Sequence, residues 1–222
     1  MKEATEEDNK MLAAQLREPI GEIGLKVAKV MNQTNESMIS ETINSLGLGM
    51  NDIVLEIGHG NGKHIHSLMK SSSNLLYYGL DISELMHKEA KYCCDELGLA
   101  ESTEFVLYNG LIIPFPKEKF KKIFTVNTLY FWEKPVLFLN EMHRVLAPAG
   151  KLSIAFVTKK TMAELAFTNY GFYKYSQEDF HALIQESEFD SYGLTSYNEE
   201  IEGKLGDGLV NREYFIAELI KK

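Results

Sequence analysis

Short runs of apolar residues recur along the middle of the chain, and stretches with helical periodicity separate them. Runs this apolar are typical of strands that are covered on both faces, as in a parallel sheet. The pattern predicts five such strands, at residues 53–57, 75–80, 105–107, 123–126 and 152–157. It predicts helices between them, at residues 63–70, 84–97 and 135–146. This alternation indicates an α/β fold with a doubly wound, mostly parallel sheet.

The two ends of the chain have different patterns. Residues 10–46 are helical in pattern, with breaks near 19–21 and 32–35. We expect residues 1–50 to form an N-terminal helical cap and residues 51–222 to form the main domain. Toward the other end, the pattern predicts a helix at about 177–188 and strands at 192–197 and 214–219, joined by a glycine-containing loop at 202–208. These two strands would form an antiparallel terminal hairpin at the edge of the sheet, which would then have seven strands.

Composition narrows the choice of partners. The chain has 222 residues, of which 45% are hydrophobic and 25% charged, the ordinary balance of one globular α/β domain. Its net charge of −9 and the lack of a basic stripe argue against binding nucleic acid. No run approaches the ~20 apolar residues that a membrane span requires. Cys93 and Cys94 fit a helical packing pattern rather than a disulfide or metal pair. A cytoplasmic location and a small or neutral substrate are therefore expected.

Three alternating glycines follow the first predicted strand, at Gly58, Gly60 and Gly62. In a doubly wound sheet this loop forms the floor of the ligand crevice, and glycines let a ligand approach the main-chain N–H groups. The spacing is also typical of a plain tight turn. A second signal is Asp81, which closes the second strand 19 residues beyond Gly62 and can accept both hydroxyls of a ribose. A nicotinamide dinucleotide fits less well, because its G-x-G-x-x-G fingerprint needs glycine where Lys63 stands.

Four segments together resemble the class I methyltransferases that use S-adenosylmethionine. Residues 54–62 resemble motif I of that family, and residues 79–83 resemble its acidic end of the second strand. Residues 108–115 and 143–152 resemble its Leu-Pro-Phe and Arg-Val-Leu-x-Pro-Gly-Gly segments. The resemblance covers residues 52–157 and, in layout, extends to residue 222. It is greatest to the small-molecule branch that includes quinone-biosynthesis methyltransferases.

The resemblance implies a set of residues that bind S-adenosylmethionine, namely Glu56, Gly58, His59, Gly60, Asp81, Ile82, Asn109, Gly110 and Asn127. Glu56 would order the loop or contact the amino group of the methionine moiety, beside Gly58, His59 and Gly60. Asp81 would hold the ribose, and Ile82, Asn109 and Gly110 would lie near the adenine. Asn127 would face the sulfonium and the acceptor.

The sequence departs from the family pattern at three places. Asn109 replaces the usual acid, and Ala149 replaces the first glycine of the Pro-Gly-Gly turn. No Asn/Asp-Pro-Pro-Tyr/Phe motif follows the fourth strand, where residues 127–130 read Asn-Thr-Leu-Tyr. Because that motif marks many methyltransferases that act on nucleic acids and protein amides, methylation of amides or exocyclic amines is disfavoured.

No residue is singled out as a catalyst. A sulfonium is already an activated leaving group, so alignment and exclusion of water are the main requirements. A base is needed only for some acceptors, and the candidates by position are His59, His87, His143, Tyr130, Phe172, Tyr173 and Tyr175. His64 and His66 point to different sides of a helix, so no metal site is predicted.

Two features leave alternatives open. The aromatic run at 167–175 fits a pocket for a planar acceptor and ordinary packing equally well. The N-terminal helices need a partner for their apolar faces, and we hypothesise that they close over the cofactor. The sequence favours methyl transfer to oxygen, carbon or nitrogen of a small molecule. A non-catalytic protein that binds S-adenosylmethionine and, less well, a nicotinamide-dependent oxidoreductase are the alternatives.

Overall fold

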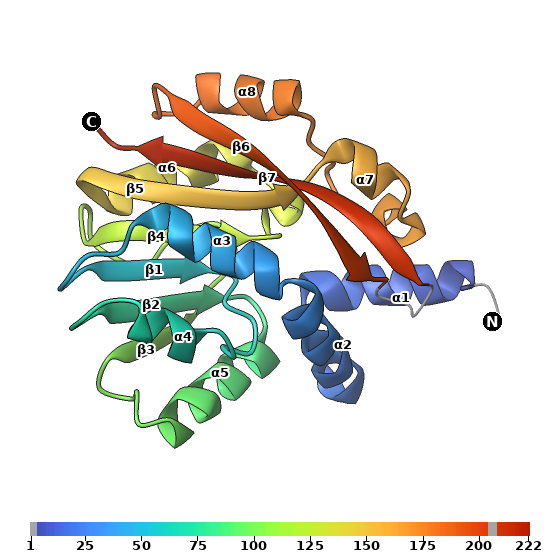
Figure 1. Cartoon of the computed structure of the whole chain (residues 1–222), viewed down its shortest axis with the longest axis horizontal. Helices are drawn as coiled ribbons and strands as arrows, with labels where there is room; N and C mark the ends of the chain where they lie inside the picture. The colour runs from blue at the N-terminus through green and yellow to red at the C-terminus, as the bar shows by residue number, and fades with distance from the viewer. Residues whose placement is uncertain (1–3, 204–207) are drawn as a thin grey trace.

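A single seven-stranded sheet organises the computed structural model, which describes residues 4–203 and 208–222 (Figure 1). The strand order is β3-β2-β1-β4-β5-β7-β6. The first five strands pair in parallel, and β7 runs antiparallel to both β5 and β6. Their bounds are β1 (Ile53–Ile57), β2 (Leu76–Asp81), β3 (Thr103–Leu107), β4 (Phe120–Val126), β5 (Leu146–Val157), β6 (Tyr192–Glu202) and β7 (Leu209–Ile220). The predicted doubly wound, mostly parallel sheet with an antiparallel terminal hairpin is confirmed.

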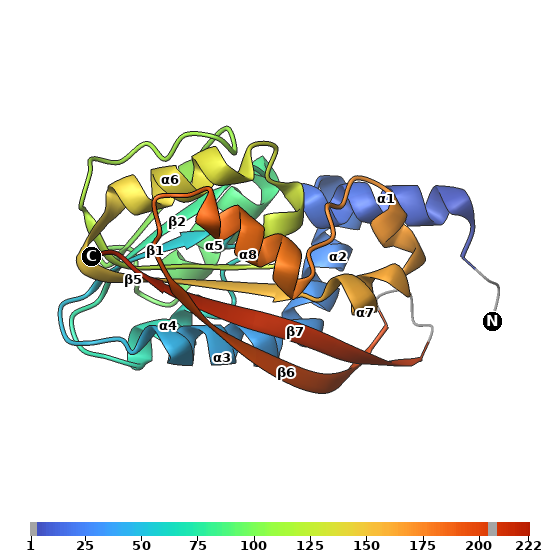
Figure 2. The same cartoon turned by 90° about the horizontal axis from the view of Figure 1, so that it is seen from above.

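Helices cover both faces of the sheet. α3 and α4 lie on one face, and α6 and α8 lie on the opposite face (Figure 2). The helices after the first strand are α4 (Ile65–Lys70), α5 (Glu84–Glu96), α6 (Pro135–Val145), α7 (Lys159–Ala163) and α8 (Gln177–Gln185). All but the short α7 were predicted, and Ser83 is the N-cap of α5, where its Oγ accepts a hydrogen bond from the N–H of Met86. No helix within residues 4–203 and 208–222 is long and apolar enough to cross a membrane.

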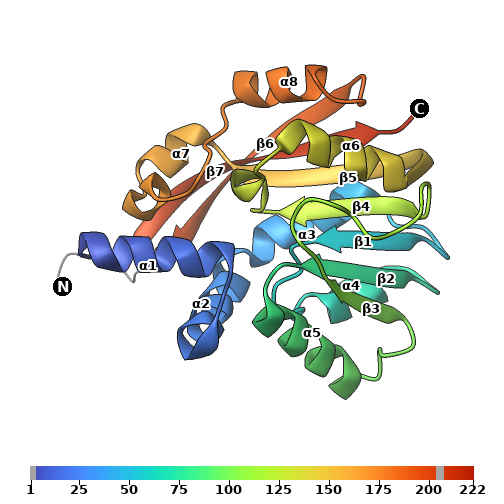
Figure 3. The ribbon, with the colours of Figure 1, turned by 180° about the vertical axis from the view of Figure 1, so that it is seen from behind.

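The N-terminal helices are α1 (Glu6–Arg17), α2 (Gly21–Thr34) and α3 (Glu36–Leu46), and they break where the sequence predicts. α1 begins with a capping box between Thr5 and Asp8, which satisfies two of its free N–H groups. α3 packs against the sheet and buries Met38 and Leu46 completely. α1 and α2 instead lie beyond the carboxyl ends of the parallel strands (Figure 3).

The strands of the terminal hairpin are longer than the sequence predicts. β6 continues to Glu202 and β7 begins at Leu209, so the predicted loop at 202–208 lies partly outside the described residues. In β7, alternate side chains point into the protein, and one of them is the charged Arg212, which is only 4% exposed. The terminal hairpin therefore contributes a buried guanidinium to the interior of the protein.

Candidate functional site

The carboxyl ends of β1, β2 and β4 form the floor of a cavity, which the N-terminal helices cover. Gly58, Gly60, Asp81 and Asn127 line it from the sheet side. α1, α2, α3 and the segments between them contribute Leu16, Arg17, Pro19, Ala28, Met31, Asn32, Asn35 and Ile39. The first strand-to-helix loop is thus at the bottom of a cavity, as the ligand crevice of a doubly wound sheet requires.

The glycines of this loop have backbone conformations that other residues adopt rarely. Gly58, Gly60 and Gly62 have φ angles of 78°, 56° and 70°. A Cβ on Gly58 would collide with Thr128, and one on Gly62 would lie 3.0 Å from the Cβ of Ala90. The loop therefore needs glycine both for its turn and for its contacts.

Asp81 holds the loop against the end of β2. Its Oδ2 accepts a hydrogen bond from the N–H of Gly60 at 3.0 Å, and its Oδ1 accepts one from the N–H of Ser83 at 2.9 Å. The carboxylate is 6% exposed, and burial raises its pKa to about 6 despite these bonds. A rise of this kind means that the charge is incompletely compensated. Hydroxyl donors from a ribose would supply the missing compensation, so the residues fit an adenosine.

Glu56 is buried at the other side of the loop and is already paired. Its Oε2 accepts hydrogen bonds from the Tyr77 hydroxyl at 2.5 Å and from the His64 Nε2 at 2.7 Å. Both Glu56 and His64 line the cavity. From the sequence, His64 was considered only as a metal ligand, so its pairing with Glu56 was missed.

His59 supports the loop from within the protein. Its Nδ1–H donates to the carbonyl oxygen of Gly60 at 2.7 Å, and the side chain is 2% exposed. Burial lowers the pKa of the imidazole to about 4, so it is neutral at physiological pH. Within the described part of the chain its Nε2 has no hydrogen-bond partner.

The other predicted binding residues divide into two groups. Ile82, Gly110 and Asn127 line the cavity. Asn109 does not, because it is exposed and its Oδ1 accepts hydrogen bonds from the N–H groups of Leu111 and Ile112. A local turn thus uses the amide that the resemblance assigned to the adenine edge, and Tyr108 lines the cavity beside Gly110.

A second cavity lies next to the first and shares part of its wall. Leu16, Met31, Asn35, Asn127 and Phe131 line both cavities. The rest of the second lining is mainly apolar and includes Tyr130, Val157, Met162, Leu165, Phe167 and Phe172. Two rings of the aromatic run at 167–175 therefore face a cavity, whereas Tyr173 is 64% exposed.

The candidate bases lie elsewhere or are engaged. His87 and His143 line neither cavity, and His143 pairs with Glu188 at 3.0 Å on a different face. Tyr130 lines the second cavity, but its hydroxyl donates to the Oδ1 of Asn127 at 2.9 Å and accepts a bond from the N–H of Val157. Burial also raises the pKa of the Tyr130 phenol well above its usual range.

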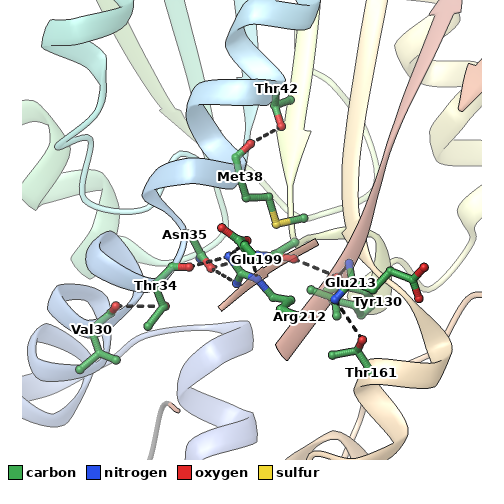
Figure 4. A network of polar contacts seen from close by, with 12 residues as sticks. Val30, Thr34, Asn35, Met38, Thr42, Tyr130, Thr161, Glu199, Arg212 and Glu213 are labelled. Carbon is green, nitrogen blue, oxygen red and sulfur yellow. Dashed lines mark hydrogen bonds and ion pairs between the residues drawn. The ribbon is translucent and has the colours of Figure 1, made fainter. Parts of the chain in front are cut away.

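A polar network is centred on Arg212 (Figure 4) and includes Asn35, which lines both cavities. The guanidinium donates to the Oδ1 of Asn35 at 3.0 Å, to the carbonyl oxygen of Thr34 at 2.6 Å and to the Oε1 of Glu199 at 2.5 Å. It thus joins the α2–α3 junction to the terminal hairpin. Sequence reasoning missed Arg212, and the available signal was its place among inward-pointing apolar residues, alternating with Val210 and Tyr214.

Comparisons with known proteins agree with this geometry. Residues 55–154 match the family model described as a methyltransferase domain. The uncharacterized methyltransferase YdaC of Bacillus subtilis (strain 168) is 29% identical over 127 residues, which make up 56% of this chain and 67% of YdaC. In four other curated relatives the matched stretch is between 25% and 63% of their length.

Two solved structures have the same fold. The YcgJ protein of Bacillus subtilis gives a TM-score of 0.72 at 14% identity, covering 84% of this chain and 99% of YcgJ. Geranyl diphosphate C-methyltransferase from Streptomyces coelicolor A3(2), solved with Mg²⁺, geranyl diphosphate and S-adenosyl-L-homocysteine, gives 0.71 at 13% identity. That match covers 94% of this chain and 88% of the other. The matched domain and the shared sheet agree with the resemblance seen in the sequence: residues 55–154 match a methyltransferase domain, and the chain has the fold of solved methyltransferases.

Proposed function

We propose that the first cavity binds S-adenosylmethionine and that its methyl group is transferred to a small molecule held in the second cavity. The observation that carries this proposal is the shared wall of the two cavities, which includes Asn127 at the end of β4. Methyl transfer needs the donor and acceptor to meet in line, with water excluded. Two adjoining cavities that share lining residues are consistent with that arrangement, whereas a purely cofactor-binding protein needs only the first.

The residues of the first cavity have distinct tasks under this proposal. The Asp81 carboxylate accepts the ribose hydroxyls, and the positive-φ glycines, which carry no Cβ, let the methionine moiety come close to the backbone of the loop. Glu56 and His64 form a paired, polar end to the cavity. The cofactor supplies an activated methyl group, so these residues have only to bind and orient it.

Calorimetry with S-adenosylmethionine, S-adenosylhomocysteine and NAD tests the cofactor assignment. We expect both sulfur compounds to bind and NAD not to bind. The Asp81→Ala variant should lose this binding while keeping its circular dichroism spectrum, and Asp190→Ala, at an exposed ion pair with Lys222, is the matched control. NAD binding without a response to either sulfur compound would overturn the proposal, and an Asp81→Ala variant with full affinity would remove the ribose contact from it.

A further inference from the structure

We infer that the acceptor is an apolar carboxylic acid, and that its carboxylate is held by Arg212 and Asn127 at the wall between the two cavities. This inference rests on the proposed function and names the acceptor class. Its basis is the direction of the hydrogen bonds at that wall, together with the charges that face the second cavity.

Arg212 fixes the direction of the hydrogen bonds that run through Asn35 and Asn127, because a guanidinium can only donate. The Asn35 atom that accepts from Arg212 is therefore its Oδ1. The same Oδ1 also accepts from Asn127 at 3.2 Å, so the Asn127 atom there is the donor Nδ2. The Asn127 Oδ1 is then left to accept from Tyr130.

Two N–H donors at the wall remain free for a ligand. Arg212 commits its Nε, both hydrogens of Nη2 and one hydrogen of Nη1, which leaves the second hydrogen of Nη1 without an acceptor among the described residues. Asn127 likewise has one Nδ2 hydrogen with no partner within that part of the chain. Because both nitrogens bond to one oxygen, they lie close together. A group with two acceptor oxygens can therefore bind both donors.

The charges around the second cavity also favour an anion. Arg212 is the one charged side chain among the described residues that line it. Its partner Glu199 does not line this cavity but contributes to a separate surface pocket with Glu200 and Glu213. The acceptor therefore meets the free edge of the guanidinium, while the carboxylate of Glu199 stabilises the buried cation from the opposite side.

The second cavity provides no base. Its described lining contains no aspartate, glutamate, histidine, lysine or cysteine, and the Tyr130 hydroxyl is committed. An alcohol or a protonated amine would need a base to remove its proton. A carboxylate is already ionised at neutral pH and needs none.

The reaction balances without a proton. A lone pair on the carboxylate oxygen forms the bond to the methyl carbon, and the electron pair of the methyl–sulfur bond goes to sulfur. The products are a neutral methyl ester and a neutral thioether, so one positive and one negative charge disappear. Apolar walls favour such a step, because the transition state is less charged than the separated reactants.

The lining of the second cavity indicates the body of the acid. Phe131, Phe167 and Phe172 face it, with Met162 and Leu165 beside them. A medium-length alkyl chain or an aromatic ring would remove water from these side chains on binding.

Decanoate and 4-phenylbutanoate are suitable probes, with decanamide, decanol and decylamine as neutral or cationic counterparts. We expect methyl esters of the acids, detected by mass spectrometry with methyl-labelled S-adenosylmethionine. Calorimetry in the presence of S-adenosylhomocysteine should show decanoate binding about tenfold or more tighter than decanamide, as a hydrogen-bonded charge predicts. Methylated amide, alcohol or amine without ester would overturn the inference, as would bound S-adenosylhomocysteine with no ester from either acid. Both results leave the cofactor site of the proposed function standing, whereas loss of cofactor binding would not.

The Asn127→Asp variant tests whether Asn127 donates to the carboxylate of the acceptor. Aspartate tolerates the positive φ of 59° at this position. It replaces a donor by a negative charge, so decanoate affinity should fall about tenfold or more, and by a larger factor than decanamide affinity, while the circular dichroism spectrum stays unchanged. Asn198→Asp makes the same change at an exposed position of β6 and is the control. Arg212→Lys keeps the buried charge and should weaken decanoate binding more than decanamide binding. Decanoate affinity that survives Asn127→Asp, or that falls together with decanamide affinity, would overturn the inference.

Discussion

Asp81 couples cofactor binding to pH. Its folded-state pKa of about 6 lies above the usual value of 3.8, so the carboxyl is protonated in mild acid and ionised above about pH 6. Ribose hydroxyls donate to the ionised form, so the affinity for S-adenosylhomocysteine should fall as the pH decreases through 6 and stay constant above 7. Calorimetry between pH 5 and 8 measures this. Asp81→Asn should bind weakly and without that decrease, and parallel pH profiles for the two proteins would contradict the prediction.

His59 couples the stability of the fold to pH. Its pKa of about 4 in the folded protein lies below the ordinary value of 6.5, because burial opposes the charged form. Between these values the unfolded chain binds a proton and the folded chain does not. Stability is therefore lost as the pH falls from 6.5 toward 4, by about 3 kcal/mol.

Urea unfolding at pH 7 and pH 4 measures this loss. In His59→Asn the decrease in unfolding free energy between the two pH values should be smaller by about 3 kcal/mol. His181→Asn, at an exposed position, should behave like the unchanged protein. An equal pH dependence for His59→Asn and the unchanged protein would show that the burial of His59 has no such effect.

The sequence identified those site residues whose role is local. Gly58, Gly60 and Asp81 stand at fixed distances from strand ends, and the structure places them at the cavity. Arg212 could not be identified in this way, because its contact with Asn35 joins residues 177 positions apart. Asn109 was expected at the cavity and is not there, since its side chain bonds to the backbone two and three residues later. Asparagine commonly forms this turn, and the local interaction prevailed.

Among the elements, α5 is connected to the α1–α2 junction through one serine. The Ser83 hydroxyl accepts from the N–H of Met86 at 3.2 Å and donates to the carbonyl oxygen of Pro19 at 2.6 Å. The side chain is fully buried. Ser83→Ala should therefore lose an N-cap and leave a buried carbonyl without a donor, at a cost of about 2 to 3 kcal/mol.

Chemical denaturation and hydrogen exchange check this prediction. The amides of residues 20–24 should exchange faster in Ser83→Ala, since the start of α2 loses its tether. Ser176→Ala is the matched control, because Ser176 caps α8 without a side-chain bond to another element, and about 1 kcal/mol is expected there. Equal losses in the two variants would mean that the bond to Pro19 contributes nothing.

At the element level, helix ends were easier to predict than strand ends. Pro19 and Gly47 stop helices through their own backbone preferences, so the breaks are encoded locally. The lengths of β5, β6 and β7 depend on pairing instead. β7 pairs with β6 from Leu209 to Leu219 and with β5 from Tyr214 to Ile220, and no pattern within one strand contains that register.

In the whole molecule, we propose that α1 and α2 act as the cover of the cofactor cavity, while α3 belongs to the core. A chain that begins at residue 35 should unfold cooperatively, because the sheet and its helices remain. A chain that begins at residue 47 loses Met38 and Leu46, which are both fully buried. This chain should not unfold cooperatively. The shorter deletion should also weaken binding of S-adenosylhomocysteine, because it removes lining residues such as Leu16 and Met31. Thermal denaturation and calorimetry measure both effects, and unchanged affinity in the chain from residue 35 would contradict the cover.

The position of β7 between β5 and β6 has a consequence for synthesis of the chain. During translation β6 leaves the ribosome before the strand that joins it to the sheet, and β5 meanwhile has an open edge. A product that stops before Leu209 would expose that edge, lack Arg212 and leave the second cavity without one wall. Unpaired strand edges pair with strands of other chains. Premature termination should therefore yield aggregates rather than a partly active enzyme.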